Sequence, residues 1–226
     1  MYRRSFVCGL AGVAFNFLSV GSAQAVTAGK VFNISWRDLN VGYSKINVSR
    51  INDELTVQTN VEIYVKLFGI EFFKYKLSSE EVWRDKKIMS LNSQVRIGNK
   101  TEFATVKRIG KETYKIEGSK FDGIISGNPA TTSYFTPDFM NRTIWISTQN
   151  GKPLKIKTER VGQRLIESTK GPINAFQWRV TGDLNINLFY DKKDEWVGSS
   201  FKAGGSTAKL ILYDKVGSTN QIWTVS

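Results

Sequence analysis

The sequence predicts a mostly all-β protein, folded as one strongly curved antiparallel sheet or open barrel of about eleven strands with one short helix. Apolar and polar residues alternate with a period of two through most of the chain after residue 30. Clusters of Gly, Asn, Asp and Lys separate these alternating runs and indicate turns. Only one short stretch carries the signals of a helix start. A flat sheet of so many strands would curl or split into two layers, so a β-sandwich is the alternative.

The first 25 residues have the features of a secretory signal peptide. Arg3 and Arg4 supply a short positive segment, an apolar stretch follows, and Ala23-Gln24-Ala25 is a small-x-small cleavage site. The apolar stretch is short for a membrane span and is interrupted by Asn16. We therefore expect 1–25 to be removed and 26–226 to form a single β-rich domain.

The clearest strand is ELTVQTNVEIYVKL, which occupies 54–67. Its apolar residues fall at every second position and its polar residues fall between them, so the strand has one buried face. A helix could not gather these residues on one side. Phe68-Gly69 interrupts the pattern and predicts a bulge or bend.

Shorter strands are expected on both sides of this one. The first alternation, Phe32, Ile34 and Trp36, precedes it. The runs that follow it are 81–84, 88–97, 101–109 and 113–118, with turns at Asp85-Lys86-Lys87, Gly98-Asn99, Gly110-Lys111 and Asp122-Gly123.

The middle of the chain combines a loop, the helix and a hairpin. Residues 126–136 lack periodicity and predict a loop. Thr136 is a suitable N-cap and Pro137 a suitable first residue for a short helix. Asn150-Gly151 is the strongest hairpin signal, and it joins 143–149 to 152–160.

The last third continues the alternation. Even-numbered apolar residues run through 176–190, which predicts one long strand bent at Gly182. A charged turn leads from that strand to Trp196. Further strands are expected at 208–213 and near 222–225.

The residue types exclude several chemistries. The chain has no His, and its one Cys, Cys8, lies in the signal peptide. Serine and cysteine hydrolase triads and ordinary zinc or copper sites are therefore excluded, and no metal or cofactor is expected. Carboxylates are the remaining candidates for catalytic groups. Asp191, Asp194 and Glu195 share one turn, and Glu80-Glu81 are adjacent, but acidic residues in a turn are usually solvated.

The chain is strongly basic, with 32 Lys and Arg against 20 Asp and Glu and a net charge of +12. Such a charge favours anionic partners. For an exported chain these are an anionic membrane surface or an envelope glycan, and nucleic acid is not expected. The alternative is that the charge only keeps the protein soluble.

Aromatic residues are the remaining candidates for a site. Trp178 has the same parity as the residues up to Tyr190, and Trp196 follows across the turn. Alternation alone would make these residues core. Since one short helix cannot cover so large a sheet, we expect Trp178, Tyr190 and Trp196 to line an apolar groove that binds a ligand.

Two segments carry a resemblance to a known family. These are EEVWRDKKIMSL at 80–91 and LFYDKKDEWVGSSF at 188–201, together with Gly-Asp-Leu at 182–184. They resemble the hairpins of a family of uncharacterised exported bacterial β-proteins, catalogued as a domain of unknown function. The chain departs from the pattern at Lys86, where a turn Gly is usual, and at Phe189, where Trp is usual. More distantly, the architecture is similar to periplasmic lipoprotein carriers, whose half-barrels hold acyl chains.

Three functions fit these observations. The first is a non-catalytic periplasmic, alternatively extracellular, binding or structural module that holds a lipid-like or lipoprotein-derived ligand on an apolar concave face. The second is a carboxylate-based hydrolase of envelope glycans. The third is a structural envelope protein with no small-molecule ligand. The sequence does not indicate an oligomeric state.

Overall fold

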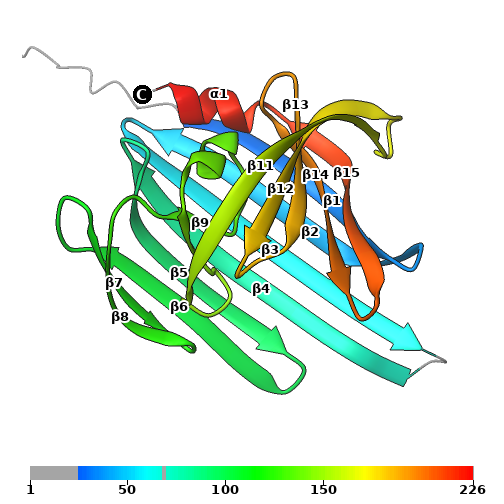
Figure 1. The fold of residues 1–226 in the computed structure, drawn as a ribbon, viewed down its shortest axis with the longest axis horizontal. Coiled ribbons are helices and arrows are strands. Elements are labelled where there is room, and N and C mark those ends of the chain that lie inside the picture. The colour runs from blue at the N-terminus through cyan, green and yellow to red at the C-terminus, as the bar shows by residue number, and fades with distance from the viewer. Residues whose placement is uncertain (1–24, 68–69, 226) are drawn as a thin grey trace, which may run out of the picture.

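A computed structural model describes residues 25–67 and 70–225 and confirms the mostly-β fold. Fifteen strands form one open, curved sheet, in place of the two sheets of a sandwich (Figure 1). The expected count of about eleven strands is too low. The predicted signal peptide, apart from Ala25, and the predicted bulge at Phe68-Gly69 lie outside the described residues.

The chain enters the sheet in its middle and builds it outward on both sides. The first eight strands are β1 Val26–Trp36, β2 Leu39–Ile51, β3 Glu54–Leu67, β4 Ile70–Arg84, β5 Lys87–Ile97, β6 Lys100–Arg108, β7 Thr113–Gly118 and β8 Phe121–Ser126. The others are β9 Ala130–Thr131, β10 Ile144–Ile146, β11 Pro153–Ile166, β12 Ile173–Gly182, β13 Ile186–Asp191, β14 Trp196–Ala203 and β15 Ser206–Val216. β15 pairs with β1, so the two halves meet there. Among the named strands, the short pair β9–β10 is parallel and the others are antiparallel.

Two of the missed strands lie where the sequence suggested loops. The chain turns at Ser119-Lys120, and Asp122-Gly123 continue within β8, because Gly118 pairs with Phe121. The predicted turn at Asp122-Gly123 is therefore wrong. The short strand β9 lies inside the predicted loop 126–136 and pairs with β10. A strand of two residues, such as β9, is too short to produce a periodic pattern in the sequence.

The region around Gly182 is a hairpin and not one bent strand. β12 and β13 run antiparallel, with Val180 opposite Ile186 and Trp178 opposite Leu188. Paired residues share a face of the sheet. The residue numbers of the paired residues differ by an even number. Even-numbered residues therefore lie on the same face before and after the turn, as they would along one strand. Alternation alone could not distinguish the two arrangements.

The predicted short helix is confirmed as the 3₁₀ helix η1, Pro137–Asn141, whose first turn is capped by the Thr136 hydroxyl. The strand predicted near 222–225 is wrong, because Thr219–Thr224 form the helix α1. The Ser218 hydroxyl accepts a hydrogen bond from the Gln221 amide at 3.0 Å and starts this helix. Within the described residues, neither helix is long and apolar enough to cross a membrane.

The main core lies on the inner, concave face of the sheet. Trp83 of β4 packs its ring 5.2 Å from Phe139 of η1 and 5.5 Å from Trp223 of α1, measured between centroids. Phe135 and Trp145, which flank η1, are fully buried in the same cluster. The segment between β8 and β10 therefore crosses the inner face and fills one part of the curve (Figure 1).

The β4–β5 turn contains an unusual residue in a left-handed conformation. Asp85 and Lys86 both have positive φ, 49° and 57°, in a two-residue turn between the paired residues Arg84 and Lys87. Because Lys86 has a Cβ, this conformation costs about 1 kcal/mol or more. We predict that Lys86→Gly raises the free energy of unfolding by roughly 0.5–1 kcal/mol in urea denaturation.

The neighbouring Lys87→Gly variant is the control for this prediction. Lys87 is the first residue of β5, where glycine is unfavourable, so this variant should lose stability. An equal loss in both variants would contradict the account of the turn.

Candidate functional site

The three predicted aromatic residues lie on one face, which parity indicated for Trp178 and Tyr190 and which the pairing of β13 with β14 shows for Trp196. Tyr190 is paired directly with Trp196, and Trp178 with Leu188 on the neighbouring strand. Tyr190 and Trp196 are only 1% and 3% exposed, whereas Trp178 is half-buried. The predicted role of Tyr190 and Trp196 as walls of an open groove is therefore not supported.

The reason for this burial is the segment between β8 and β10. The Tyr190 hydroxyl donates to the Tyr134 carbonyl at 2.9 Å, and the Tyr134 ring lies 5.9 Å from that of Trp196. The Trp196 indole also packs 4.3 Å from Phe32 and donates to the Gly198 carbonyl at 2.8 Å. Both polar tips are thus satisfied inside the protein, as expected for core residues.

A second apolar cluster lies beside the main core, shares Leu210 with it, and is only partly covered by the residues that the structure describes. Ile34, Val41 and Val65 are buried at its centre. The half-buried residues packed around them are Trp36, Val61, Ile63 and Leu210. We call these four residues the hollow cluster.

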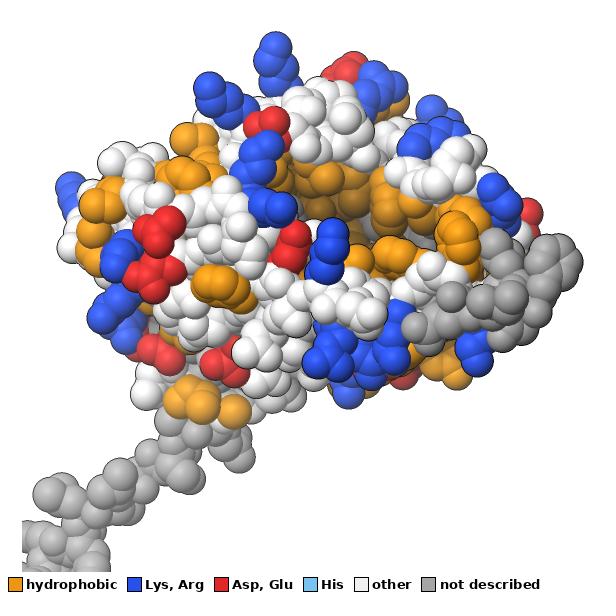
Figure 2. Space-filling view, turned by 90° about the horizontal axis from the view of Figure 1, so that it is seen from below, with side chains coloured by type: hydrophobic (Ala, Val, Ile, Leu, Met, Phe, Trp, Pro, Cys, Tyr) orange, Lys and Arg blue, Asp and Glu red, His pale blue; other side chains and the backbone are white. Residues whose placement is uncertain are grey.

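The pairing of the strands places the hollow cluster on the inner face. Leu210 pairs with Ile34, Ile34 with Gly42, and Gly42 with Ile63. Trp36 is the last residue of β1, and its indole donates to the Ala203 carbonyl at the end of β14 at 2.8 Å. The cluster is therefore near the end of the sheet where β14 turns into β15. The view from this side shows a hollow with a hydrophobic wall and Lys and Arg side chains around it (Figure 2).

A cation stands beside this cluster. The Arg37 guanidinium lies 4.4 Å from the centre of the Trp36 ring, and its Nε donates to the Ser206 hydroxyl at 3.1 Å. Within the described residues, Arg37 makes no ion pair with a carboxylate. An arginine that is stacked on an aromatic ring keeps further donors for an anionic group.

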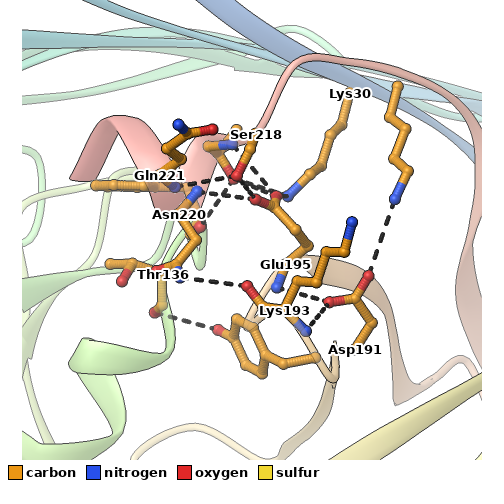
Figure 3. A network of polar contacts seen from close by, with 12 residues as sticks. Lys30, Thr136, Asp191, Lys193, Glu195, Ser218, Asn220 and Gln221 are labelled. Atoms are coloured by element: carbon orange, nitrogen blue, oxygen red, sulfur yellow. Dashed lines mark hydrogen bonds and ion pairs between the residues drawn. The ribbon is translucent and has the colours of Figure 1, made fainter. Parts of the chain in front are cut away.

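A buried ion pair joins β1 to the turn between β13 and β14. The Lys30 ammonium lies 2.5 Å from the Glu195 carboxylate, and both side chains are nearly inaccessible (Figure 3). Glu195 also accepts hydrogen bonds from the amides of Thr219 and Asn220 and from the Ser218 hydroxyl at the start of α1. Glu195 is therefore not a solvated turn former but a structural clamp between the sheet and α1.

The electrostatics of this pair follow from its burial and its partners. Burial alone would raise the pKa of the Glu195 carboxyl, but the Lys30 charge and the hydrogen bonds outweigh it and lower the pKa to about 2. Burial lowers the pKa of Lys30, and Glu195 opposes this effect. Asp191 accepts from the backbone amides of Lys193 and Glu195 in the same turn. These carboxylates are thus occupied by structural contacts.

Glu81 is a second buried carboxyl, and it lies at the start of the strand predicted at 81–84, although its burial was not predicted. One of its oxygens accepts hydrogen bonds from the Trp83 indole at 2.8 Å, the Thr131 hydroxyl at 3.0 Å and the Ser133 hydroxyl at 3.3 Å. The other oxygen is buried without a partner. Burial is the main influence on the Glu81 carboxyl and raises its pKa to about 7, against these hydrogen bonds. Glu81 therefore links β4 by hydrogen bonds to the segment between β8 and β10, which we call the inner segment.

The alternation in the sequence could have identified Glu81 as a buried residue. Glu81 is an even number of residues from Leu77 and Trp83, so its side chain faces the core as theirs do. Glu80 has the opposite parity and is exposed. Among the described residues, no group of three or more Asp or Glu side chains is placed to hold a metal ion.

These features define the class of protein: a single open, curled antiparallel sheet with one filled part and one apolar hollow. The chain belongs to the family described as "Domain of unknown function (DUF6134)", whose model matches residues 32–213. This match confirms the resemblance to an uncharacterised β-protein family. No curated protein matches the chain.

The solved structures that share the fold include a beta-barrel-like protein of the domain of unknown function DUF1849 from Brucella abortus. The superposition has a TM-score of 0.61, covers 84% of this chain and 97% of the other, and pairs residues that are 7% identical. At this identity the likeness extends to the fold alone.

The buried ion pair yields a stability prediction. Lys30→Met leaves the Glu195 carboxylate buried without its cation, so the free energy of unfolding should fall by about 3–5 kcal/mol in urea denaturation. Arg179→Met, which breaks the exposed pair with Glu159, should cost less than about 1 kcal/mol. Equal losses in the two variants would show that burial does not set the strength of the clamp.

Glu81 yields a pH prediction. Its pKa is higher in the folded protein than in the unfolded chain, so the folded state binds more protons between pH 4.5 and about 7. Stability should therefore fall as the pH rises through this range, by on the order of 3 kcal/mol, and then level off. The chain has no His that would titrate in the same range. Urea denaturation at pH 5 and pH 8 measures the difference.

Two variants of adjacent residues isolate the cause of this pH dependence. Glu81→Gln removes the ionisable group and should remove most of the difference between pH 5 and pH 8. Glu80→Gln changes an exposed carboxylate on the opposite face and should keep it. If Glu81→Gln retains the wild-type pH dependence, Glu81 is not its source.

Proposed function

We propose that this protein is an exported, periplasmic binding module without catalytic activity, and that its hollow holds one single-chain anionic amphiphile. The apolar chain lies against the hollow cluster, and the headgroup meets Arg37. The basic surface favours an anionic membrane as the source of this ligand. The signal peptide expected at 1–25 supports the location.

The hollow cluster is the observation that carries the proposal. Three of these four side chains, Trp36, Val61 and Ile63, do not pack against the main core, which the inner segment and α1 already cover, and Leu210 contacts both clusters. An apolar surface that is left partly open inside a concave face is a common form of ligand site. A chain with about ten buried methylene groups contributes about 8 kcal/mol, which corresponds to micromolar affinity.

Arg37 supports an anionic headgroup over a neutral one. Its guanidinium is held over Trp36 at the edge of the cluster, so little further ordering is needed when it binds a carboxylate or phosphate. Asp191 and Glu195, two of the carboxylates considered for a hydrolase, have structural partners, and this supports a role in binding over catalysis.

Titration with lysophospholipids tests the proposal. Lysophosphatidylglycerol, kept below its critical micelle concentration, should change the tryptophan fluorescence saturably in the micromolar range. Lysophosphatidylcholine with the same acyl chain should bind more weakly, and Arg37→Gln should reduce this preference. If neither lipid causes a saturable change in the folded protein, the proposal is wrong and a structural envelope role is favoured.

Two matched variants locate the site. Ile63→Ser removes apolar contact inside the hollow and should weaken binding about tenfold, equivalent to about 1.4 kcal/mol. Leu165→Ser removes an equally apolar side chain that is 72% exposed on β11 and should leave the affinity unchanged. Thermal unfolding of each variant confirms that it is folded.

A further inference from the structure

The outer face of the sheet carries a second surface with a different chemistry. A depression of about 570 Å³ lies over β3 to β6. It is lined by exposed side chains that point away from the core, namely Gln58, Asn60, Ser78, Glu80, Asn92, Gln94, Phe103 and Thr105. We call this set the amide patch.

The patch consists of two adjacent rows that run across four strands. In one row, Gln58 pairs with Glu80, Glu80 with Asn92, and Asn92 with Thr105. In the other row the members, in order, are Asn60, Ser78, Gln94 and Phe103. Directly paired side chains lie about 5 Å apart, so the amides and hydroxyls form a dense, regular array.

The patch is nearly free of charge, although the chain as a whole is highly charged. Its one carboxylate, Glu80, accepts a hydrogen bond from the Gln58 amide at 2.9 Å. The next row on the same face is ionic, with Glu62 and Lys76 paired at 3.0 Å and Arg96 beside them. A solvent-facing sheet surface needs only to be hydrophilic, and the neighbouring row achieves this with ions. In the adjacent row on the other side, Thr56, Val82 and Ser90 of β3 to β5 are uncharged, so the depression lies in a neutral part of this face.

The chemistry of the patch selects a neutral, hydroxyl-rich ligand. An amide side chain both donates and accepts hydrogen bonds. It therefore matches hydroxyl and acetamido groups, which also donate and accept hydrogen bonds. An anionic ligand would find no compensating charge among the side chains of the patch. Phe103, 46% exposed at the end of one row, offers a flat apolar face for the C–H side of a sugar ring.

We infer that the amide patch binds a neutral glycan chain, with the amides holding its hydroxyl or acetamido groups and Phe103 contacting a ring. The patch lies on the face opposite the hollow cluster, so the inference does not depend on lipid binding. The two sites together would join a glycan layer to a membrane-derived ligand.

Calorimetric titration with chitohexaose, a neutral hexamer of N-acetylglucosamine, tests this inference. Binding should be saturable and should persist at 0.5 M salt, because no ion pair is involved. The double variant Asn92→Ala/Gln94→Ala should weaken it at least tenfold, and Phe103→Ala should weaken it too. Gln163→Ala, which removes an exposed amide on β11 outside the patch, should leave the affinity unchanged.

Two outcomes would overturn the inference. One is the absence of heat and of side-chain amide shifts in NMR spectra at millimolar chitohexaose. The other is binding that disappears at 0.5 M salt and is equal in the wild type and the double variant, which would indicate attraction to the basic surface. Lipid binding by the same double variant should be unchanged, so the failure of either proposal is recognisable separately.

Discussion

The fold depends on covering the concave face of a sheet that is too large to lie flat. Fifteen strands curl around a space that their own side chains do not fill. The segment between β8 and β10 enters this space, and its Phe135 and Phe139 pack against Trp83. The curvature of the sheet and the position of this segment therefore require each other.

Polar contacts hold the inner segment and α1, which cover the concave face, in place. Glu81 binds the hydroxyls of the inner segment from β4, and the pair Lys30–Glu195 holds the start of α1 against the sheet. Both carboxyls are fully or almost fully buried. Their hydrogen bonds therefore fix the positions of the inner segment and α1 as well as stabilising them. The covering stops short of the cluster around Ile34. The apolar hollow is thus a consequence of where the inner segment ends.

Alternation predicted the strands and the faces of their residues because burial on one side of a sheet imposes a period of two. It placed 54–67 correctly and put Trp178 and Tyr190 on one face. It could not separate a hairpin from a bent strand at Gly182, because parity is the same in both. Nor could it show that Tyr134 covers Trp196, or that the hollow lies instead at Trp36 and Ile63, because these contacts join residues far apart in the sequence.

The most direct test of the central claim is to observe the acyl chain inside the hollow. The protein would be labelled with ¹³C at its Ile, Leu and Val methyl groups and saturated with deuterated-headgroup lysophosphatidylglycerol. Intermolecular NOEs should connect the acyl chain to methyl groups of Val61, Ile63 and Leu210. NOEs confined to exposed residues such as Ile124 and Leu165, with none to the hollow cluster, would contradict the account.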